Sequence, residues 1–431
     1  MKINIPNHIK HVMNLVKSYD YEIYLVGGCL RDTLLGKEPK DYDLATNCDI
    51  NKLKEIFSNF NLINNNGEKH NTITIYNEKS NIEITTFKHD ENEANTIEAD
   101  LGHRDITINA LAYANDELID FCNSQEDLRN KLIRAVNNPY DRFKEDPLRI
   151  LRVLRFSSIL DFDIDQLTSQ AMFDLKDLLL NVSKERIKAE LNLILIGKKV
   201  KHILKKYSSI FFVIIPELQP CLNFDQKNKY HKNTLYDHIV NVVSNTKENS
   251  IVRMAALLHD IAKPKCITID KNNQGHFYIH PIKSMYMGES ILKRLKYSNE
   301  EISKINYLVK HHDTTLSTNQ KSIRKNYAKT PNLDEELFYS LIDLINADKK
   351  DHITGELIDL NKVKYFINKI KEENDCLKIS DLAIDGNDLL NLGYKGKEIG
   401  DTLSFLLKIV IEEKLENKED KIIEYLKTAN L

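Results

Sequence analysis

The feature that most constrains this 431-residue chain is a glycine pair followed closely by two aspartates. An apolar run ends at Gly27-Gly28, and a short polar stretch then leads to Asp41-x-Asp43. Residues two apart on a strand point to the same face, so the two aspartates are predicted to lie side by side. Adjacent carboxylates repel unless a cation lies between them, and Mg²⁺ prefers carboxylate and phosphate oxygens. A glycine turn before a helix presents backbone N–H groups to phosphate, so the stretch favours a nucleotide-polymerising site over a hydrolase pocket.

The whole stretch reads LVGGCLRDTLLGKEPKDYDLAT, residues 25–46. It resembles the signature of the nucleotidyltransferase superfamily that includes DNA polymerase β. Within that superfamily it is similar to the class II tRNA nucleotidyltransferases (CCA-adding enzymes) and the bacterial poly(A) polymerases. The resemblance implies that Asp41 and Asp43 are catalytic and hold two Mg²⁺ ions, and that Gly28 and Arg31 contact the nucleotide. The plainer alternative is a glycine turn with two solvated aspartates.

A chain of this length is expected to form about three domains, at roughly 100–200 residues each. The resemblance implies an α+β fold, with a small mixed-sheet, polymerase β-like head followed by helical regions. The order of its motifs predicts a nucleotidyltransferase head (1–136), a base-selecting helical neck (137–225), a histidine-rich helical module (226–360) and a helical RNA-binding tail (361–431). The net charge of −3 leaves any contact with RNA to local basic patches.

The six cysteines are scattered and form no CxxC pair. This spacing argues against a disulfide framework and a zinc ribbon, and favours a reducing cytosol. The first residues are too polar for a signal peptide and are expected to form an amphipathic helix. No apolar run approaches the ~20 residues of a membrane span. We therefore expect a cytoplasmic protein without a membrane partner, and no obligate protein partner is evident.

Two strands with alternating apolar residues are predicted at 73–77 and 81–87, and together they form a hairpin. Glu83 alternates with apolar neighbours on the second strand. If this strand lies beside the aspartate pair, Glu83 is a third acidic group of the site. A solvent-facing glutamate explains the pattern equally well, and both interpretations stay open.

The second motif is HRDITINALAY, residues 103–113. It resembles the RRDFTINAL motif of the same family, whose arginine and aspartate contact the ribose and phosphates of the incoming nucleotide. Arg104 and Asp105 match that motif. His103 stands where the family usually has another arginine, so no role is carried over to it. An arginine–aspartate pair at the start of a helix is the alternative.

The third motif lies in RFKEDPLRILRVLRFSSIL, residues 142–160, which is predicted to form one helix. It resembles the E-D-x-x-R motif, in which an aspartate and an arginine serve as an amino-acid template for the base; here these are Asp146 and Arg149. A carboxylate accepts from an exocyclic amine and a guanidinium donates to ring nitrogens or carbonyls. Asp146 before Pro147 is also a good helix cap, which is the alternative. Two further arginines reach the triphosphate or solvate the helix: Arg152 and Arg155.

The next amphipathic helix, NVSKERIKAELNLIL, resembles the family's neck helix and is interpreted as structural. A basic run follows it and either meets RNA phosphates or is solvated surface; its lysines are Lys198, Lys199, Lys201, Lys205 and Lys206. The tail resembles the C-terminal body of the family, which grips tRNA by shape. Lys395 and Lys397 are candidate contacts there.

Histidines concentrate between residues 231 and 352, around the segment LLHDIAKP. Their order resembles that of the HD metal-dependent phosphohydrolases, with ligands in the order H…HD…D. The implied ligands are His238, His259, Asp260 and Asp348. Imidazole and carboxylate donors suit Mn²⁺, Ni²⁺, Co²⁺ or Zn²⁺. His231 opens the motif, and His280 and His311 are candidates for a second metal site or for phosphate binding.

These motifs predict a template-independent nucleotidyltransferase that adds CMP and AMP from CTP and ATP to the 3′ end of tRNA. A poly(A) polymerase, or an enzyme that adds only CC or only A, shares the same motifs. From another class, an HD phosphohydrolase with a non-catalytic RNA-binding head is the alternative. A non-catalytic RNA-binding protein is disfavoured, because the acidic pair would repel RNA.

Overall fold

The computed structural model describes residues 3–63, 71–76, 81–89, 94–227, 233–352 and 356–428. The chain divides into two compact units, Met1–Pro216 and Glu217–Leu431. The finer, four-part division expected from the motifs stays a prediction. Within the described ranges, none of the helices combines the length and the apolar composition that crossing a membrane requires.

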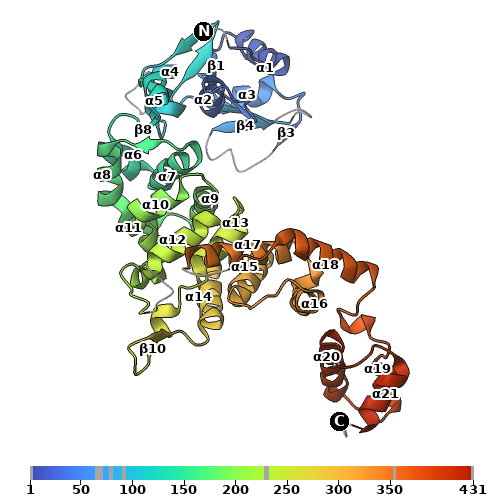
Figure 1. The fold of residues 1–431 in the computed structure, drawn as a ribbon. Helices are drawn as coiled ribbons and strands as arrows, with labels where there is room; N and C mark the ends of the chain where they lie inside the picture. The colour runs from blue at the N-terminus through green and yellow to red at the C-terminus, as the bar shows by residue number, and fades with distance from the viewer. Residues whose placement is uncertain are drawn as a thin grey trace. The chain divides into compact units, whose positions relative to one another are not determined.

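The first unit begins with a mixed sheet (Figure 1). The sheet has seven strands in the order β3-β4-β5-β2-β1-β6-β7. Only β2 and β5 pair in parallel among its strands. The strands are β1 (Ile23–Val26), β2 (Tyr42–Thr46), β3 (Leu62–Ile63), β4 (Thr72–Ile75), β5 (Ile82–Thr86), β6 (Ala112–Ala114) and β7 (Glu117–Ile119). The antiparallel pair β4–β5 confirms the expected hairpin. The expected end of its first strand, Asn77, lies outside the described residues.

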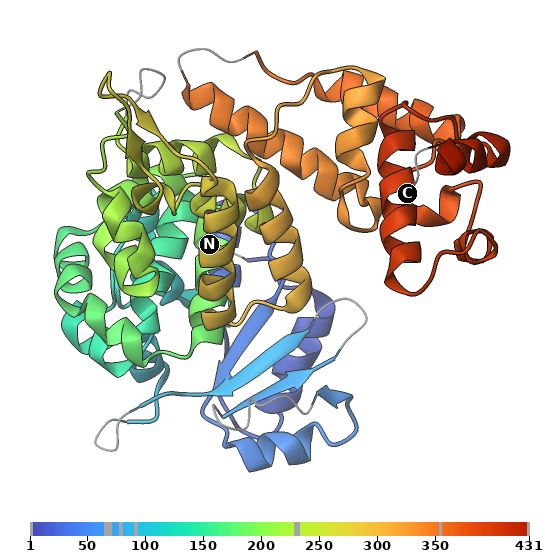
Figure 2. The same cartoon turned by 90° about the horizontal axis from the view of Figure 1, so that it is seen from below.

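Helices pack against this sheet, which Figure 2 shows in blue beside them. The first helix forms because Ile9, Val12, Met13 and Val16 recur at helical spacing and bury one face. The helical elements of this part are α1 (Asn7–Lys17), α2 (Gly28–Leu34), α3 (Ile50–Ile56), α4 (Ile97–Gly102), η2 (Thr107–Asn109) and α5 (Ser124–Arg129). The short helix α2 begins at Gly28, the second glycine of the pair, so the predicted turn and helix are present.

The rest of the first unit is mainly helical. Its elements are β8 (Leu132–Ile133), α6 (Pro139–Glu145), α7 (Leu148–Leu160), β9 (Asp163–Ile164), α8 (Gln166–Leu175), η3 (Lys176–Asn181), α9 (Lys184–Leu195), α10 (Val200–Lys206) and α11 (Ser208–Ile214). The expectation of one helix over 142–160 is wrong. The helix breaks at Asp146, with φ −142° and ψ 99°, because the following proline lacks an N–H and disfavours the helical conformation in the residue before it.

The second unit is almost entirely helical, and α12, α13, α15 and α17 pack against one another around the histidine-rich centre. Figure 2 shows α14 and α15 side by side in gold. The elements are η4 (Pro216–Cys221), α12 (Leu235–Asn245), α13 (Ser250–Leu258), η5 (Lys263–Lys265), β10 (Thr268–Ile269), β11 (Gly275–His276), α14 (His280–Arg294), α15 (Asn299–His311), α16 (Gln320–Tyr327), η6 (Pro331–Leu333), α17 (Glu335–Asp351), α18 (Leu360–Glu372), η7 (Ile379–Asp381), α19 (Gly386–Asn391), α20 (Lys397–Ile411) and α21 (Glu419–Thr428). The last three helices close around a core of their own.

Candidate active site and metal centre

The glycine turn after β1 brings Asp43 and Arg104 to the same point. Val26 at the end of β1 pairs with Asp43 at the start of β2, and Gly27 turns the chain with φ +78°. A Cβ on Gly27 would lie 3.0 Å from Nη1 of Arg104 and 3.7 Å from Oδ2 of Asp43. Only glycine fits such a conformation and such a close approach. Asp41 is exposed and lies directly before the same strand.

Asp43 lies among other carboxylates. It is the register neighbour of Glu83 across the parallel pair β2–β5. Burial, followed by the charge of Glu83, raises the pKa of Asp43 to about 6, and Asp41 adds to the rise. Arg104 lowers this pKa and so offsets part of the effect. A carboxylate whose pKa is raised by neighbouring negative charges is relieved by a cation, so the surroundings of Asp43 fit a divalent metal ion.

Arginine side chains around the turn are held by acids and amides. Nε and Nη2 of Arg104 both donate to Oδ2 of Asp100, at 3.2 and 2.9 Å. Arg31 donates to Asn109 at 2.7 Å and to its neighbour Asp32 at 2.9 Å. Because both guanidinium groups are fixed by these partners, their positive charge stays beside the carboxylates of the turn.

Asp105, which is buried, forms an ion pair with the half-buried Arg152 and so joins α7 to the sheet-containing part of the first unit. Nε of Arg152 donates to Oδ2 of Asp105 at 2.7 Å. Burial alone would raise the pKa of the Asp105 carboxyl, but the charge and the hydrogen bond of Arg152 outweigh burial and lower it. Asp105 also accepts from the backbone N–H of Ile106 at 2.9 Å. The second motif therefore contributes to holding α7 in place.

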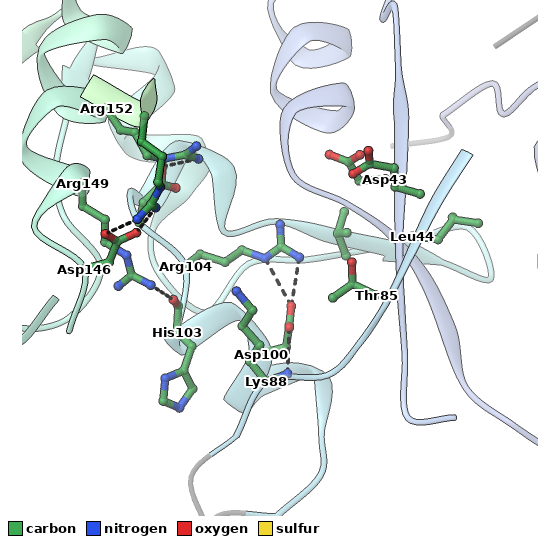
Figure 3. Close-up of a pocket in the computed structure, with 14 residues that line it drawn as sticks. Asp43, Leu44, Thr85, Lys88, Asp100, His103, Arg104, Asp146, Arg149 and Arg152 are labelled. Atoms are coloured by element: carbon green, nitrogen blue, oxygen red, sulfur yellow. Dashed lines mark hydrogen bonds and ion pairs between the residues drawn. The ribbon is translucent and has the colours of Figure 1, made fainter. Parts of the chain in front are cut away.

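A cavity of about 390 Å³ gathers residues of all three motifs. In Figure 3, Arg104 lies between Asp43 on one side and Asp146 and Arg149 on the other. The lining residues are Val26, Asp43, Leu44, Glu83, Thr85, Lys88, Asp100, His103, Arg104, Asp105, Asp146, Arg149, Arg152 and Arg186. One cavity thus contains a carboxylate that can bind a metal ion and cations that can bind phosphate. It also contains a hydrogen-bond acceptor and a donor that can pair with a base.

Asp146 and Arg149 each have protein partners within this cavity. Asp146 accepts from Arg186 and also from the backbone N–H of Leu148 at 3.2 Å, so it does contact the start of α7. Arg149 donates to Glu145 and to the carbonyl of His103, both at 2.8 Å. A carboxylate has about four acceptor sites and a guanidinium five donors, so both groups keep capacity for a base.

Four of the predicted residues do not line the cavity: Gly28, Arg31, Asp41 and Arg155. Arg155 instead pairs with Glu190 at 3.2 Å. The ring of Phe156 lies under three guanidinium groups, with Cζ of Arg155 at 4.2 Å, of Arg31 at 5.1 Å and of Arg152 at 5.9 Å from its centroid. This cation–π cluster ties α2 to α7.

Sequence reasoning missed Arg186 and treated its helix, α9, as purely structural. Arg186 and the buried Glu190 are four residues apart on that helix. Charged residues at this spacing lie on the same face of a helix. A pair of opposite charges on a helix that also packs against the core is the sequence signal that could have identified them.

Among the lysines considered for RNA, Lys199 is paired with Asp163 at 2.6 Å, whereas Lys395 and Lys397 are exposed at the start of α20.

In the second unit, the four predicted ligands converge. Nε2 of His238 lies 3.3 Å from Nε2 of His259. It lies 3.4 Å from Oδ2 of Asp260 and 3.1 Å from Oδ1 of Asp348. His238 comes from α12, His259 and Asp260 follow α13, and Asp348 lies on α17. Four residues from three helices therefore point at one place.

The histidines are held with Nε2 facing this centre. Nδ1 of His259 lies 2.7 Å from the carbonyl oxygen of Ala256, and a carbonyl only accepts, so Nδ1 carries the proton and donates. The same geometry recurs for His280 and His312, whose Nδ1 atoms lie 2.8 and 2.7 Å from carbonyl oxygens. In neutral rings this leaves the Nε2 lone pair for a cation, as in metal-ligating histidines.

Charges at the centre depend strongly on one another. Burial would lower the pKa of His238, but Asp260, Asp348 and Asp351 outweigh it and raise it to about 10. Oδ1 of Asp260 makes no hydrogen bond within the described part of the chain, although Nε2 atoms of His280 and His312 lie 3.2 and 3.5 Å away. A buried carboxylate oxygen facing two imidazole nitrogens fits a metal ion.

The histidine that joins His280 beside Asp260 is His312, not the expected His311. Successive helical residues point about 100° apart, so only one of the two can face the centre. The ring of His311 instead lies 4.9 Å from that of Tyr307, and burial followed by nearby lysines lowers its pKa to about 4. His231 lies outside the described residues. Sequence reasoning also missed Asp351, which lies 2.8 Å from Nδ1 of His238, and Lys263, which lies 2.6 Å from Asp260.

Three family models match the chain along its length. The model described as the poly A polymerase head domain matches residues 23–134. A model for an RNA- and SrmB-binding site of polymerase A matches residues 161–222. A model for tRNA nucleotidyltransferase domain 2 matches residues 283–426.

Individual proteins match over nearly the whole chain. The CCA-adding enzyme of Lactobacillus helveticus is 29% identical over 436 residues, covering 96% of this chain and 95% of the relative. The structure of the Bacillus stearothermophilus CCA-adding enzyme in complex with CTP has a TM-score of 0.73 at 21% identity, covering 99% and 98% of the two chains. The Thermotoga maritima CCA-adding enzyme complexed with tRNA has a TM-score of 0.60 at 20% identity, covering 99% and 96%. Over nearly its whole length the chain is therefore similar to CCA-adding enzymes, and its residues 23–134 match the poly A polymerase head domain.

Proposed function

We propose that this protein is a tRNA nucleotidyltransferase that adds CMP and AMP to the 3′ end of tRNA from CTP and ATP and releases pyrophosphate. The observation that carries the proposal is the single cavity in which Asp43, Arg104, Asp146 and Arg149 meet. The relatives named CCA-adding enzymes, which match over nearly the whole chain, support it, as do the similar folds solved with CTP and with tRNA.

Asp41 and Asp43 would hold two Mg²⁺ ions, with Glu83 as a third acidic neighbour. The raised pKa of Asp43 reflects carboxylates that a cation would relieve. When bound, magnesium lowers the pKa of the tRNA 3′-hydroxyl and neutralises charge on the departing pyrophosphate. Arg104, held by Asp100 and facing Gly27, orients the triphosphate. Its fixed position costs no reorganisation during the reaction.

Asp146 and Arg149 would select the base. The carboxylate of Asp146, oriented by Arg186, accepts from the exocyclic amine of cytosine or adenine. Arg149, fixed by Glu145 and the carbonyl of His103, donates to the ring nitrogen or carbonyl. Uracil and guanine place a carbonyl where Asp146 needs a donor, and an unpaired buried polar group costs about 1–3 kcal/mol.

Incubation of the protein with tRNA transcripts that lack their 3′ end tests this function. CTP alone should yield two added nucleotides, and CTP with ATP should yield three. Asp43→Asn should abolish addition. Long A tracts on any RNA would indicate a poly(A) polymerase instead, and unchanged CTP incorporation by Asp41→Ala would favour a head that only binds RNA.

Because all six cysteines are free, we place the protein in the reducing cytoplasm.

We infer a second activity, phosphoester hydrolysis by the histidine-rich centre of the second unit. The convergence of His238, His259, Asp260 and Asp348 favours it. These residues belong to two groups of three that share His238, and within each group the ligand atoms lie within 4.8 Å of one another. Nitrogen and carboxylate donors suit Ni²⁺, Mn²⁺ or Co²⁺. Such an ion, when bound, lowers the pKa of water for attack on phosphorus.

The two activities separate by mutation. Chelated protein supplied with Ni²⁺, Co²⁺, Mn²⁺ or Mg²⁺ is assayed on RNA ending in a 3′-phosphate or a 2′,3′-cyclic phosphate. His259→Ala should abolish phosphate release from the 3′-phosphate and ring opening of the 2′,3′-cyclic phosphate, and leave nucleotide addition intact, whereas Asp43→Asn should do the reverse. The absence of both phosphate release and ring opening with every metal would remove the second activity and leave the first untouched.

A further inference from the structure

The last two turns of α17 face the histidine-rich centre with more groups than the predicted ligand set uses. Asp348 lies in the last turn of α17, and His352 follows four residues later as the C-cap residue of the same helix. Between them, Asp351 reaches Nδ1 of His238 at 2.8 Å. One helix end thus supplies a ligand, a group that orients a ligand, and a further imidazole.

The imidazole of His352 is close enough to take part. The ligand atoms of His238, Asp348 and His352 all lie within 4.8 Å of one another. Nε2 of His352 is 3.5 Å from Oδ1 of Asp348. The rings of His352 and His238 are stacked, with centroids 5.6 Å apart and planes at 28°. This group shares His238 with the group formed by His238, His259 and Asp260.

We propose that His352 is a fifth protein ligand of the cation position formed by His238, His259, Asp260 and Asp348. The proposal rests on the second proposed activity, because it presupposes the metal centre. A single Nε2 atom binds one cation, so the two groups that share His238 describe one position and not two. His352 therefore adds to that position instead of forming a separate site.

A fifth ligand changes which metal the position prefers. Three imidazole nitrogens and two carboxylate oxygens, with one solvent molecule, complete six-coordinate geometry. Zn²⁺ sites in proteins are mostly tetrahedral with four ligands. Ni²⁺, Co²⁺ and Mn²⁺ accept six N/O ligands readily. His352 therefore biases this centre toward six-coordinate transition metals and keeps one position open for substrate or water.

The structural alternative is an ion pair between Asp348 and His352 at the end of the helix that binds no metal ion. The chain offers a matched example of such a pair. Nε2 of His276 lies 3.1 Å from Oδ2 of Asp270 in a hairpin of the same unit, with side chains 36% and 34% exposed. His352 and Asp348 are more enclosed, at 26% and 14% exposed. His276→Ala is therefore the control for loss of a surface histidine.

The experiment titrates the full chain with Co²⁺ after chelation, and follows both calorimetric affinity and visible absorption. In wild type the cobalt spectrum should be weak, as for six-coordinate Co²⁺. His352→Ala should raise the Kd by about tenfold or more, intensify the absorption several-fold as coordination number falls, and shift competition from Ni²⁺ toward Zn²⁺. His276→Ala should change none of these, and circular dichroism should show all three proteins folded.

Unchanged affinity and spectrum in folded His352→Ala would overturn the role of His352 while leaving the metal centre in place. His259→Ala, which removes a ligand of the same position, should abolish the cobalt signal. If wild type binds no Co²⁺, both the second activity and the role of His352 fail together, whereas nucleotide addition by the first unit is not affected.

Discussion

The guanidinium of Arg186 donates to both carboxylate oxygens of Asp146, at 2.7 and 3.3 Å. The two residues come from different elements, because Arg186 lies on α9 and Asp146 lies between α6 and α7. A bidentate pair of this kind fixes the plane of the carboxylate as well as its charge. The orientation of the Asp146 carboxylate, on which the proposed choice of base rests, therefore depends on a residue of another helix.

Arg186→Ala is expected to weaken base selection more than it weakens the chemical step. Without its partner, the Asp146 carboxylate can turn and no longer opposes the carbonyl of uracil at a fixed position. Selectivity for CTP over UTP should fall about tenfold, since the discrimination is of the order of 1–3 kcal/mol. Arg186→Lys should give an intermediate value, because lysine keeps the charge but lacks the fork. Single-nucleotide incorporation with each triphosphate measures the ratio.

Arg294→Ala is the matched control for this prediction. Arg294 makes a similar bidentate pair with Glu217, at 2.7 and 2.8 Å, in the second unit. Its loss should leave nucleotide selectivity unchanged. An equal fall in selectivity in both variants, or none in Arg186→Ala, would contradict the assigned role.

Gly27→Ala is expected to abolish nucleotide addition. The backbone at Gly27 has φ +78°, where a side chain costs about 1–3 kcal/mol. The new Cβ would also lie 3.0 Å from Nη1 of Arg104, so the arginine must shift from the position in which we propose that it orients the triphosphate. Gly36→Ala separates the two effects, because Gly36 has φ +72° with nothing within 4 Å of an added Cβ. It should lose a similar amount of thermal stability yet retain activity.

Much of the first unit could be predicted because its signals are local. The glycine turn and the hairpin each depend on neighbouring residues, and the structure has both. The pairing of Asp41 with Asp43 stays a prediction, because Asp41 lies before β2 and does not line the cavity. The break at Asp146 was missed because helical spacing outweighed the effect of Pro147. The partnership of Asp146 with Arg186 joins residues 40 apart, and no periodicity predicts such a contact. His312 was mistaken for His311, because one helical position decides which of two adjacent histidines faces the centre.

Magnesium affinity at the first site is expected to fall as pH drops through about 6. Asp43 has its pKa raised to about 6 by burial, then by Glu83, so below that pH a proton occupies the carboxylate and competes with the cation. The apparent Kd for Mg²⁺ should rise about tenfold for each pH unit below 6. Calorimetric Mg²⁺ titrations between pH 5 and 8 measure this dependence.

Glu83→Gln distinguishes the two interpretations of Glu83. If Glu83 acts only through its charge, the variant lowers the pKa of Asp43, and the loss of Mg²⁺ affinity moves to lower pH. If Glu83 also binds the cation, affinity falls at every pH. A pH dependence that is identical to wild type would contradict the electrostatic coupling across β2 and β5.

Asp351→Ala is expected to weaken transition-metal binding in the second unit without touching nucleotide addition. Asp351 lies 2.8 Å from Nδ1 of His238, and it accepts from Asn241 at 2.8 Å, which fixes it in turn. Removing the acceptor frees the ring to rotate and lowers the basicity of Nε2. Loss of such an orienting carboxylate typically costs about 10–100-fold in metal affinity. Asp343→Ala is the control, because Asp343 lies on the same helix and accepts only from the backbone N–H of Lys247 among the contacts described. Ni²⁺ titration of both variants should separate them, and equal affinities would show that His238 is oriented by its packing alone.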